Sequence, residues 1–490
     1  MNWTDGYASD TDYQAGFFRE QSPVYLSFAC ALNGVEPIDT GRPYTYFELG
    51  FGRGLTANLL AASNPHGQFF AADFNPAYVA GARQLAGQAA LDNLTLLEAS
   101  FADLADGKHS ALPPCDFISL NGVYTWVSEE NRRQIVRFIE RYLKPGGIVY
   151  ISYNAMPGWA SALPLQRLLV DHAELRAGGT GTKVDRARAF CRQLEQVKAG
   201  YFDANPGLSR PLDALQRESS DYLAHEYMHR CWQPLYHKDV AHDLAGAKLD
   251  YAGSAHLPHA FPSLAFTPEQ QQLLDAVDDH TLRETIKDYL LNTSYRQDIF
   301  VRGARRMKPL RQAEWLLRSG LALTVRRADV KPHDAADAPL FDALALRPHT
   351  LAELAALSGR ELAGMARTAA VLIASGQVCP YIFSGAGVPP AAAQRLNQAI
   401  ARHSTIDDDY QGLASPLLGN GVAAGLVQRL VYLALCAEPA GPGAPDAAAI
   451  VRQVAAGLRG HSTIDQAQLA DTVQAILRER LPIWRQLQVL

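Results

Sequence analysis

The residues best suited to chemistry form a glycine-rich turn near the start of the chain. An apolar run over 44–49 leads into Glu-Leu-Gly-Phe-Gly-Arg-Gly at 48–54, and Asp73 closes the next apolar run. Glycines at the end of a buried strand allow a tight turn and let a ligand approach the backbone, while the following helix offers its N-terminus. A carboxylate at the tip of the neighbouring strand can accept hydrogen bonds from ribose hydroxyls. The pattern predicts a pocket for an adenosine-containing cofactor.

The spacing of the glycines distinguishes between cofactors. A dinucleotide site has the order G-x-G-x-x-G, whereas this turn has the order acid-x-G-x-G-x-G. A zwitterionic amino-acid tail suits the turn better than a diphosphate, because Glu48 can bind its ammonium group and backbone N–H groups its carboxylate. The turn therefore favours S-adenosylmethionine, although an ordinary strand-to-helix turn would use similar glycines. The residues expected to bind this cofactor are Glu48, Gly50, Gly52, Gly54, Asp73, Phe74, Phe101, Ala102 and Asn121.

Short apolar runs alternate with helical stretches in the first third of the chain. The runs cover 44–49, 68–72, 94–97, 116–120 and 148–153, and the helical stretches cover 55–62, 76–90 and 128–143. Strands separated by helices predict an α/β fold with a doubly wound, Rossmann-like parallel sheet. Lys144-Pro145-Gly146-Gly147 stands where the last of these helices must end and the chain must turn.

Two segments on either side of this region indicate which protein family the chain resembles. One is Tyr13-Gln-Ala-Gly-Phe-Phe-Arg-Glu-Gln-Ser-Pro23, and the other is His225-Glu-Tyr-Met-His-Arg-Cys-Trp-Gln-Pro-Leu-Tyr236 with its continuation to Ser254. With the glycine turn, they make the chain resemble class I S-adenosylmethionine-dependent methyltransferases that carry a methyltransferase regulatory domain. The best understood relatives of that family are the rickettsial protein-lysine methyltransferases of outer-membrane proteins. The resemblance implies a methyltransferase, and a lysine side chain of a protein substrate as its acceptor.

The part of the site that binds the methyl acceptor is expected near the ends of the fourth and fifth strands. The stretch from Asn121 to Trp126 is not the Asn-Pro-Pro-aromatic tetrapeptide typical of methylation at planar nitrogens. This departure favours an aliphatic amine or another acceptor. We expect Tyr124 and Trp126 to hold a cationic group, and Tyr153 and Asn154 to face the same crevice. Packing in the core is the alternative role for each of these aromatic residues.

Breaks in the pattern divide the 490 residues into four regions. We expect a helical lid over 1–40, the cofactor-binding core over 41–200, a helical regulatory domain over 201–330 and a helical, partly winged-helix-like domain over 331–490. The last region has a helix-turn-helix cadence over 340–378, but its second helix offers only Arg367 as a basic residue. We therefore expect it to contact protein rather than DNA.

Composition argues against several classes of protein. The net charge is −5 without a long basic run, which disfavours a nucleic-acid partner. No apolar stretch has the length of a membrane span and no signal-peptide pattern is seen, so we expect a cytoplasmic enzyme that does not insert into membranes. Six cysteines without a C-x-x-C pair imply neither a disulfide framework nor a zinc-cysteine site. The sequence leaves open whether the protein forms a homodimer.

One motif competes with this interpretation. His225-Glu-Tyr-Met-His229 matches the H-E-x-x-H pattern of zinc hydrolases, but the surrounding residues follow the regulatory-domain pattern, so we expect no metal. Two other functions also stay open: a small-molecule methyltransferase, and a cofactor-binding regulator without activity. An open acidic groove would favour the lysine enzyme, a closed apolar chamber the small-molecule enzyme, and a blocked path to the sulfonium the regulator.

Overall fold

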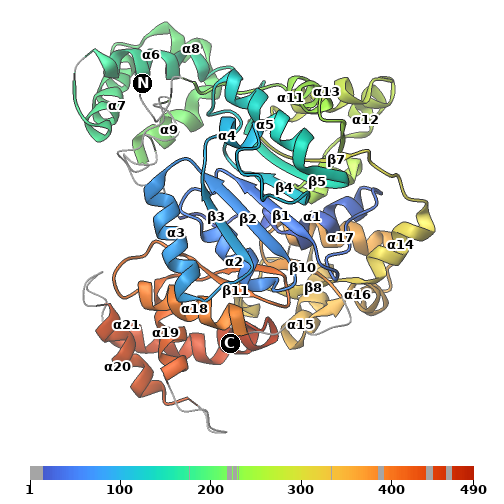
Figure 1. Ribbon diagram of the computed structural model, residues 1–490, viewed down its shortest axis with the longest axis vertical. Helices are drawn as coiled ribbons and strands as arrows, with labels where there is room; N and C mark the ends of the chain where they lie inside the picture. The colour runs from blue at the N-terminus through green and yellow to red at the C-terminus, as the bar shows by residue number, and fades with distance from the viewer. Residues whose placement is uncertain are drawn as a thin grey trace.

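A mixed sheet lies at the centre of the computed structural model (Figure 1), which describes residues 15–175, 177–217, 223, 229, 231–332, 334–383, 391–437, 445–458 and 466–490. The sheet has seven strands in the order β3-β2-β1-β4-β5-β7-β6. Their bounds are β1 Thr45–Leu49, β2 Gln68–Asp73, β3 Leu94–Glu98, β4 Cys115–Leu120, β5 Leu143–Asn154, β6 Leu249–Ser254 and β7 Tyr295–Arg302. Strands β1 to β5 run parallel, and β7 pairs antiparallel with both β5 and β6.

Helices connect the parallel strands and cover both faces of the sheet (Figure 1). They are α2 Leu55–Ser63, α3 Pro76–Gln88, the short α4 Phe101–Ala105 and α5 Glu129–Tyr142. Strand residues such as Phe47, Ile118 and Ile151 are fully buried, as central strands of a doubly wound sheet must be. The predicted α/β fold is confirmed, and the expected strand and helix bounds agree closely except that β5 already begins at Leu143.

The middle of the chain departs from the helical domain expected over 201–330. It contains α11 His237–Ala245, α12 Pro268–Asp275 and α13 His280–Leu291, but also strands β6 and β7, which complete the central sheet. A boundary near residue 200 would therefore cut through one sheet. Strand β7 did not stand out in the sequence because Arg296 and Asp298, which are buried, interrupt its apolar pattern.

A separate group of helices lies beyond one end of the sheet, at the upper left of Figure 1. It comprises α6 Leu163–Glu174, α7 Thr180–Gln196, α8 Gly200–Ala204 and α9 Ser209–Arg217. These helices share an apolar cluster of their own, built around residues such as Leu169, Val184 and Leu215. They belong to the part of the chain that connects β5 to the middle segment.

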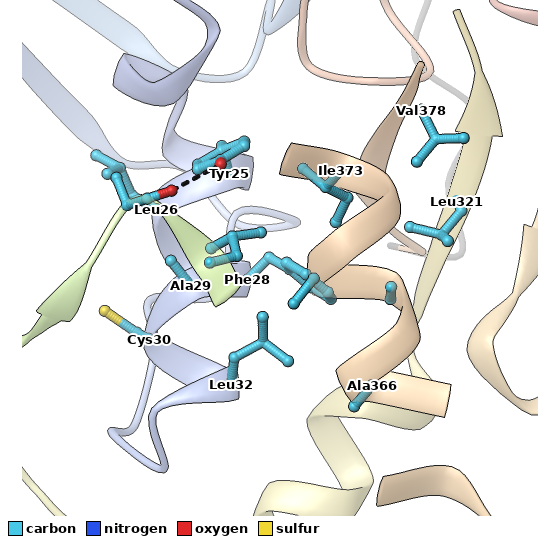
Figure 2. Close-up of a cluster of buried hydrophobic side chains, with 14 of the residues drawn as sticks. Tyr25, Leu26, Phe28, Ala29, Cys30, Leu32, Leu321, Ala366, Ile373 and Val378 are labelled. Atoms are coloured by element: carbon cyan, nitrogen blue, oxygen red, sulfur yellow. Dashed lines mark hydrogen bonds between the residues drawn. The ribbon is translucent and has the colours of Figure 1, made fainter. Parts of the chain in front are cut away.

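The winged-helix-like unit packs onto the core. It contains α14 Pro309–Leu317, β8 Ser319–Leu323, α15 Ala338–Leu346, β9 His349–Thr350, α16 Leu351–Ser358, α17 Leu362–Ala374 and β10 Val378–Ile382, with a sheet in the order β10-β8-β9. Figure 2 shows Ala366 and Ile373 of α17 facing Phe28 and Leu32 of α1 (Pro23–Leu32). The apolar face of α17 is therefore buried against the core, and the exposed face carries Ala363, Gly364 and Arg367, with Arg367 as its one basic residue.

Helix α1 is also not the mobile cover that a lid would be. All of its residues are buried, and the Tyr25 hydroxyl donates a hydrogen bond to the carbonyl oxygen of Ala255 at 2.8 Å. Only the segment before it, 16–21, borders the site described below. The expected N-terminal lid is therefore a packed helix preceded by a short wall, over the described part of 1–40.

The last unit covers the helices of the core. It comprises α18 Ala391–His403, the hairpin of β11 Gly412–Ser415 and β12 Asn420–Ala423, α19 Leu426–Ala437, α20 Ala447–Gly457, α21 Gln466–Ala475, a π-helical turn over Ile476–Arg480 and α22 Leu481–Gln486. Its apolar residues share one cluster with Leu55 and Leu59 of α2 and Leu85 of α3. Within the described ranges, none of the helices is long and apolar enough to cross a lipid bilayer.

Candidate functional site

A cavity of about 430 Å³ lies at the carboxyl ends of the parallel strands. Residues at or just after the ends of β1, β2, β4 and β5 line it, and segment 16–21 closes another side. Open doubly wound sheets bind ligands at this edge, where the connections diverge. The predicted residues found in its lining are Glu48, Gly50, Gly52, Asp73, Phe74, Phe101, Asn121, Trp126 and Asn154.

The three glycines of the turn have different roles. All have positive φ, of 71° at Gly50, 57° at Gly52 and 77° at Gly54. A Cβ on Gly50 would lie 2.7 Å from Cγ2 of Val123, and one on Gly54 would lie 2.5 Å from Cβ of Ala82. A Cβ on Gly52 would meet no described atom within 4 Å, because this glycine faces the cavity. Gly52 therefore leaves room for a ligand, whereas Gly54 allows α2 to pack on α3 and does not itself line the cavity.

Asp73 is fixed by backbone donors at the tip of β2. Its Oδ2 accepts a hydrogen bond from the N–H of Gly52 at 2.9 Å, and its Oδ1 accepts one from the N–H of Asn75 at 2.9 Å. Burial raises the pKa of Asp73 to about 6, although these backbone donors act in the opposite direction. Each carboxylate oxygen has a second lone pair. Asp73 can therefore hold the glycine turn and still accept hydrogen bonds from two vicinal hydroxyls.

Glu48 carries a buried oxygen without a partner. Its Oε2 has no hydrogen bond to any described residue, and the residue lines the cavity. Burial raises the pKa of Glu48 to about 8, and the nearby charge of Asp73 adds to the effect. A cation beside Oε2 would stabilise the ionised form and satisfy this oxygen. The ammonium group of a methionine tail has the charge that this position requires.

Asn121 is oriented by hydroxyl donors behind it. Its Oδ1 accepts hydrogen bonds from the hydroxyls of Tyr150 and Ser152, each at 3.0 Å. The Tyr150 hydroxyl accepts in turn from Nε2 of Gln297 at 2.9 Å, and the Ser152 hydroxyl from the N–H of Gly122 at 2.8 Å. Because Oδ1 already accepts these two hydrogen bonds, Asn121 is left with its amide nitrogen, which can donate a hydrogen bond to a ligand.

Aromatic rings line the side expected to hold the adenine. Phe74, Phe101 and Tyr78 border the cavity, whereas Ala102 is not part of its lining. Asp103, the nearest acid to Phe101, accepts hydrogen bonds from the hydroxyl of Ser100 at 2.8 Å and from Lys108. Since the carboxylate of Asp103 is engaged with these neighbours, the rings are the main feature that this side offers a purine.

The opposite side of the cavity is built from aromatic rings and an amide. Trp126 and Asn154 line it, together with Trp159, Ser294 and Tyr295, which the sequence had not suggested. The indole N–H of Trp159 donates to the carbonyl oxygen of Ser294 at 2.8 Å, so the start of β7 holds this ring in place. Among the described residues of the lining, the only carboxylates are Glu48 and Asp73, at the other end. The acidic groove expected for a lysine enzyme is therefore not found in this lining.

The rings of His229 and Trp232 contact Trp126 and support it. Its ring centroid lies 5.4 Å from that of His229 and 6.1 Å from that of Trp232, and the rings of Trp159 and Trp232 are in edge contact at 5.0 Å. Aromatic pairs at these separations are favourable in edge-to-face and tilted arrangements. His229 and Trp232 belong to the flanking segment that suggested the regulatory domain, so this segment supports one wall of the site.

Two residues expected on the acceptor side lie elsewhere. The Tyr124 hydroxyl donates to Oδ2 of Asp243 at 3.0 Å, and Tyr124 lines a different groove. The Tyr153 hydroxyl donates to Oδ2 of Asp298 at 2.6 Å in the buried interior. Successive side chains of a strand point to opposite faces, so Tyr153 points away from the cavity when Asn154 faces it. Both tyrosines are structural supports in this arrangement.

The zinc motif falls mostly outside the described residues. His225 and Glu226 are not among them, and the buried His229 packs on Trp126. His237, a nominal third ligand, instead contacts Oδ2 of Asp298 through Nδ1 at 3.0 Å. In the described parts of the chain, no group of three or more histidine, cysteine or acidic side chains is arranged to hold a metal ion.

Two family models match the chain. Residues 47–147 match a model described as "Methyltransferase domain", and residues 219–302 match one described as "Predicted methyltransferase regulatory domain". The first range runs from the middle of β1 through β4 and includes the glycine turn that lines the cavity. The second contains β6 and β7, which complete the same sheet.

Similar proteins extend over most of the chain. The uncharacterized protein sll1526 of Synechocystis is 34% identical over 457 residues, which are 90% of each protein. The uncharacterized protein RP028 of Rickettsia prowazekii is 28% identical over 227 residues, 45% of this chain and 86% of that protein. Among solved structures, PKMT2 from Rickettsia typhi in complex with AdoHcy has a TM-score of 0.72 at 17% identity, covering 98% of this chain and 100% of that one. The likeness to PKMT2 extends the shared fold to the helical C-terminal units.

Proposed function

Because the chain belongs to the S-adenosylmethionine-dependent methyltransferases that carry a methyltransferase regulatory domain, we propose that it methylates the side-chain amine of lysine in a protein substrate. The observation that carries this proposal is the acceptor wall, formed by Trp126, Trp159, Tyr295 and Asn154, which reaches the surface at the 46% exposed Tyr295. Aromatic rings stand there in place of the acidic groove expected for a lysine enzyme, and their faces can attract an ammonium group. A second support is the likeness in fold to PKMT2 of Rickettsia typhi.

The residues at the cofactor end fit S-adenosylmethionine. Glu48 has an unpartnered oxygen for the ammonium group, Asp73 has free lone pairs for the ribose hydroxyls, and Gly52 leaves space beside the backbone. When bound, S-adenosylmethionine supplies an electrophilic methyl group on a sulfonium sulfur. We propose that Phe74 and Phe101 flank its adenine.

The acceptor wall suits an amine that must be neutral to react. A lysine amine has an ordinary pKa near 10.4, and removing it from water without a nearby carboxylate lowers that pKa. Rings of tryptophan and tyrosine attract the ammonium form as it enters. Asn154 lines the cavity, and its buried Nδ2 has no hydrogen-bond partner among the described residues. The Oδ1 atom of the same amide can accept one amine N–H, which would orient the nitrogen.

The exposure of Tyr295 favours a protein over a small molecule. This side chain is 46% exposed while it also lines the cavity, so the aromatic wall continues to the surface. A long, flexible side chain can reach through such an opening while its backbone stays outside. A small acceptor would gain more from complete enclosure, because ligand sites for small molecules bury most of the ligand surface.

The proposal is tested with labelled methyl donor. The purified protein is incubated with S-adenosylmethionine labelled in the methyl group and a bacterial lysate, and protein-bound label is separated from small-molecule label. We expect label on protein and, after acid hydrolysis, in methylated lysines. Label confined to small molecules would refute a protein acceptor, and no incorporation at all would favour a silent regulator.

A pair of neighbouring variants tests the acceptor wall. Trp126→Ala should lower protein methylation by roughly 10- to 100-fold, because misplacement of a reacting group costs rate steeply. Tyr124→Phe is the matched control, since its ring lies outside the cavity and only one hydrogen bond is lost. Both variants should bind S-adenosylhomocysteine like the original protein. Equal methylation by the two variants would contradict the role given to Trp126.

A further inference from the structure

A second cavity lies behind the cofactor site. It has a volume of about 520 Å³ and is formed where segment 16–21, the winged-helix-like unit and the β12–α19 connection meet. Segment 16–21 separates the two cavities: Gly16, Phe18 and Gln21 line the cofactor site, whereas Phe17, Arg19 and Glu20 line the second cavity. A ligand in the second cavity would therefore contact a wall of the first.

A buried guanidinium group that forms no ion pair with any described residue borders this cavity. Arg480 is only 5% exposed, and its hydrogen bonds go to the carbonyl oxygens of Thr324 and, at 3.0 Å, of Ala423. Its Nε has no acceptor among the described residues, and no carboxylate there forms an ion pair with it. Burial lowers the pKa of Arg480 to about 10. A buried charge of this kind is normally paired, because its desolvation is costly.

The acids nearest to Arg480 are engaged with another arginine. Asp329 binds Arg326 at 2.6 Å, and Glu479 binds the same guanidinium at 3.2 Å. On the other wall, Arg19 is paired with Glu20 at 3.0 Å. Glu479 also pairs with Arg478 at 2.6 Å. Among the described residues, four guanidinium groups, that of Arg480 included, therefore face three carboxylates, and Asp329 acts on Arg480 through its charge without forming an ion pair.

An uncapped helix N-terminus borders the same cavity. Helix α19 begins at Leu426, and its N-cap position is Gly425, which has no side chain to accept the first N–H groups. The N–H groups of residues 426–428 have no acceptor in the described part of the chain, and the first bond of the helix runs from Arg429 to Gly425. Such a terminus attracts anions through its free N–H groups and its dipole. The bond from Arg480 to Ala423 places the guanidinium two residues from Gly425.

We propose that this cavity binds a small organic anion, with its carboxylate or phosphate group held between Arg480 and the N-terminus of α19. The remaining walls include Phe17, Val325 and Val422, which suit an apolar body attached to the charged group. Arg480 and the helix terminus are independent features, one a side chain and the other a backbone end. Both have the same unmet need for negative charge.

The test uses the full chain and thermal unfolding. The probes are inorganic phosphate and acetate, each compared with sodium chloride at equal ionic strength. We expect a saturable rise in the melting temperature of at least about 2 °C with one or both probes, since a ligand that binds only the folded state stabilises it. The probe that acts at the lower concentration identifies the preferred charged group.

Substitutions at two positions make the test specific. Arg480→Gln should abolish the response. Gly425→Asp should also abolish it, because the new carboxylate caps α19 from within, and should raise the melting temperature without any probe. Gly425→Ala is the matched control and should respond like the original protein. A Cβ on Gly425 meets no described atom within 4 Å, so neither change at this position disturbs packing.

The melting temperatures of the variants distinguish a specific anion site from a general salt effect. A probe response that is kept in Gly425→Ala and lost in both Arg480→Gln and Gly425→Asp supports the site. Should Arg480→Gln fail to fold, the pair of Gly425 variants still decides. The absence of a saturable response to either probe, or an equal response of Gly425→Asp and Gly425→Ala, would overturn the proposal.

Discussion

The unpartnered oxygen of Glu48 leads to a prediction about pH. In the unliganded protein the pKa of this carboxyl is about 8 because the group is buried. The proposed ammonium partner needs the ionised form, so binding of S-adenosylhomocysteine should release a proton below that pH. The group ionises as pH rises, and affinity should therefore increase with pH and level off above about 8.

The magnitude follows from the pKa. At pH 7, about one molecule in ten has an ionised Glu48 when the pKa is about 8, and the cost of ionising the rest is about 1.4 kcal/mol. At pH 8 about half of the molecules are ionised, so the dissociation constant should fall roughly fivefold between these two pH values. Asp73, with a pKa of about 6, is nearly all ionised in this interval and contributes little.

Calorimetry measures both quantities. Titration with S-adenosylhomocysteine at pH 7 and 8, in buffers with different ionisation enthalpies, gives the affinity and the number of protons released. Glu48→Gln should bind more weakly and with little pH dependence, whereas the same substitution at the exposed Glu98 should change neither property. A flat profile in the original protein, or a slope that survives in Glu48→Gln, would refute the role of this carboxyl.

Three further predictions concern the turn and the sheet. Gly52→Asn should abolish binding of S-adenosylhomocysteine without unfolding the protein, because asparagine tolerates positive φ while its side chain enters the cavity. Gly359→Asn, at a φ of 65°, is the control. Loss of binding in this control would indicate a general backbone effect. A chain ending at Ala199 should not bind S-adenosylhomocysteine, since it lacks β6 and β7; binding by a soluble fragment in calorimetry would contradict this. Tyr153→Phe should lower the free energy of unfolding by about 1–3 kcal/mol, because it leaves a buried oxygen of Asp298 with one donor fewer, and a change confined to methylation rate would instead place this residue at the acceptor.

The sequence was informative wherever function depends on a local pattern. The order of strands and helices up to β5 and the acid-and-glycine turn are set by residues close together in the chain, and the structure places Glu48, Gly52 and Asp73 around one cavity. The apolar runs predicted the strands because central parallel strands are buried on both faces.

The residues around the methyl acceptor were harder to predict from the sequence. Their positions depend on which face of the sheet each side chain points to, and on segments that are distant in the chain. The end of β5 was located correctly, but Tyr153 and Asn154 point to opposite faces, and only Asn154 reaches the cavity. Ser294 lies just before β7 and Tyr295 begins it, more than a hundred residues later, and their place follows from the pairing of β7 with β5. No local signal indicates such a pairing when the strand itself carries buried charges.

Those buried charges explain why the regulatory segment is inseparable from the core. Arg296 of β7 binds Asp298 on its own strand at 2.9 Å and Asp288 of α13 at 2.8 Å, and its Nη2 donates to the Tyr251 hydroxyl of β6 at 3.2 Å. Removing one partner of a buried network of this kind typically costs about 3–5 kcal/mol, so it must assemble as a whole.

The same network reaches the acceptor strand. Burial alone would raise the pKa of Asp298, but Arg296 and the hydrogen bond with His237 bring that pKa below its usual range. The ionised Asp298 accepts the hydroxyl of Tyr153, and the next residue of β5 is Asn154, which faces the cavity. The position of the Asn154 amide, which is proposed to orient the lysine amine, is therefore set by charged residues between 237 and 298. The catalytic and regulatory segments are separate in sequence, but they share one sheet and one site.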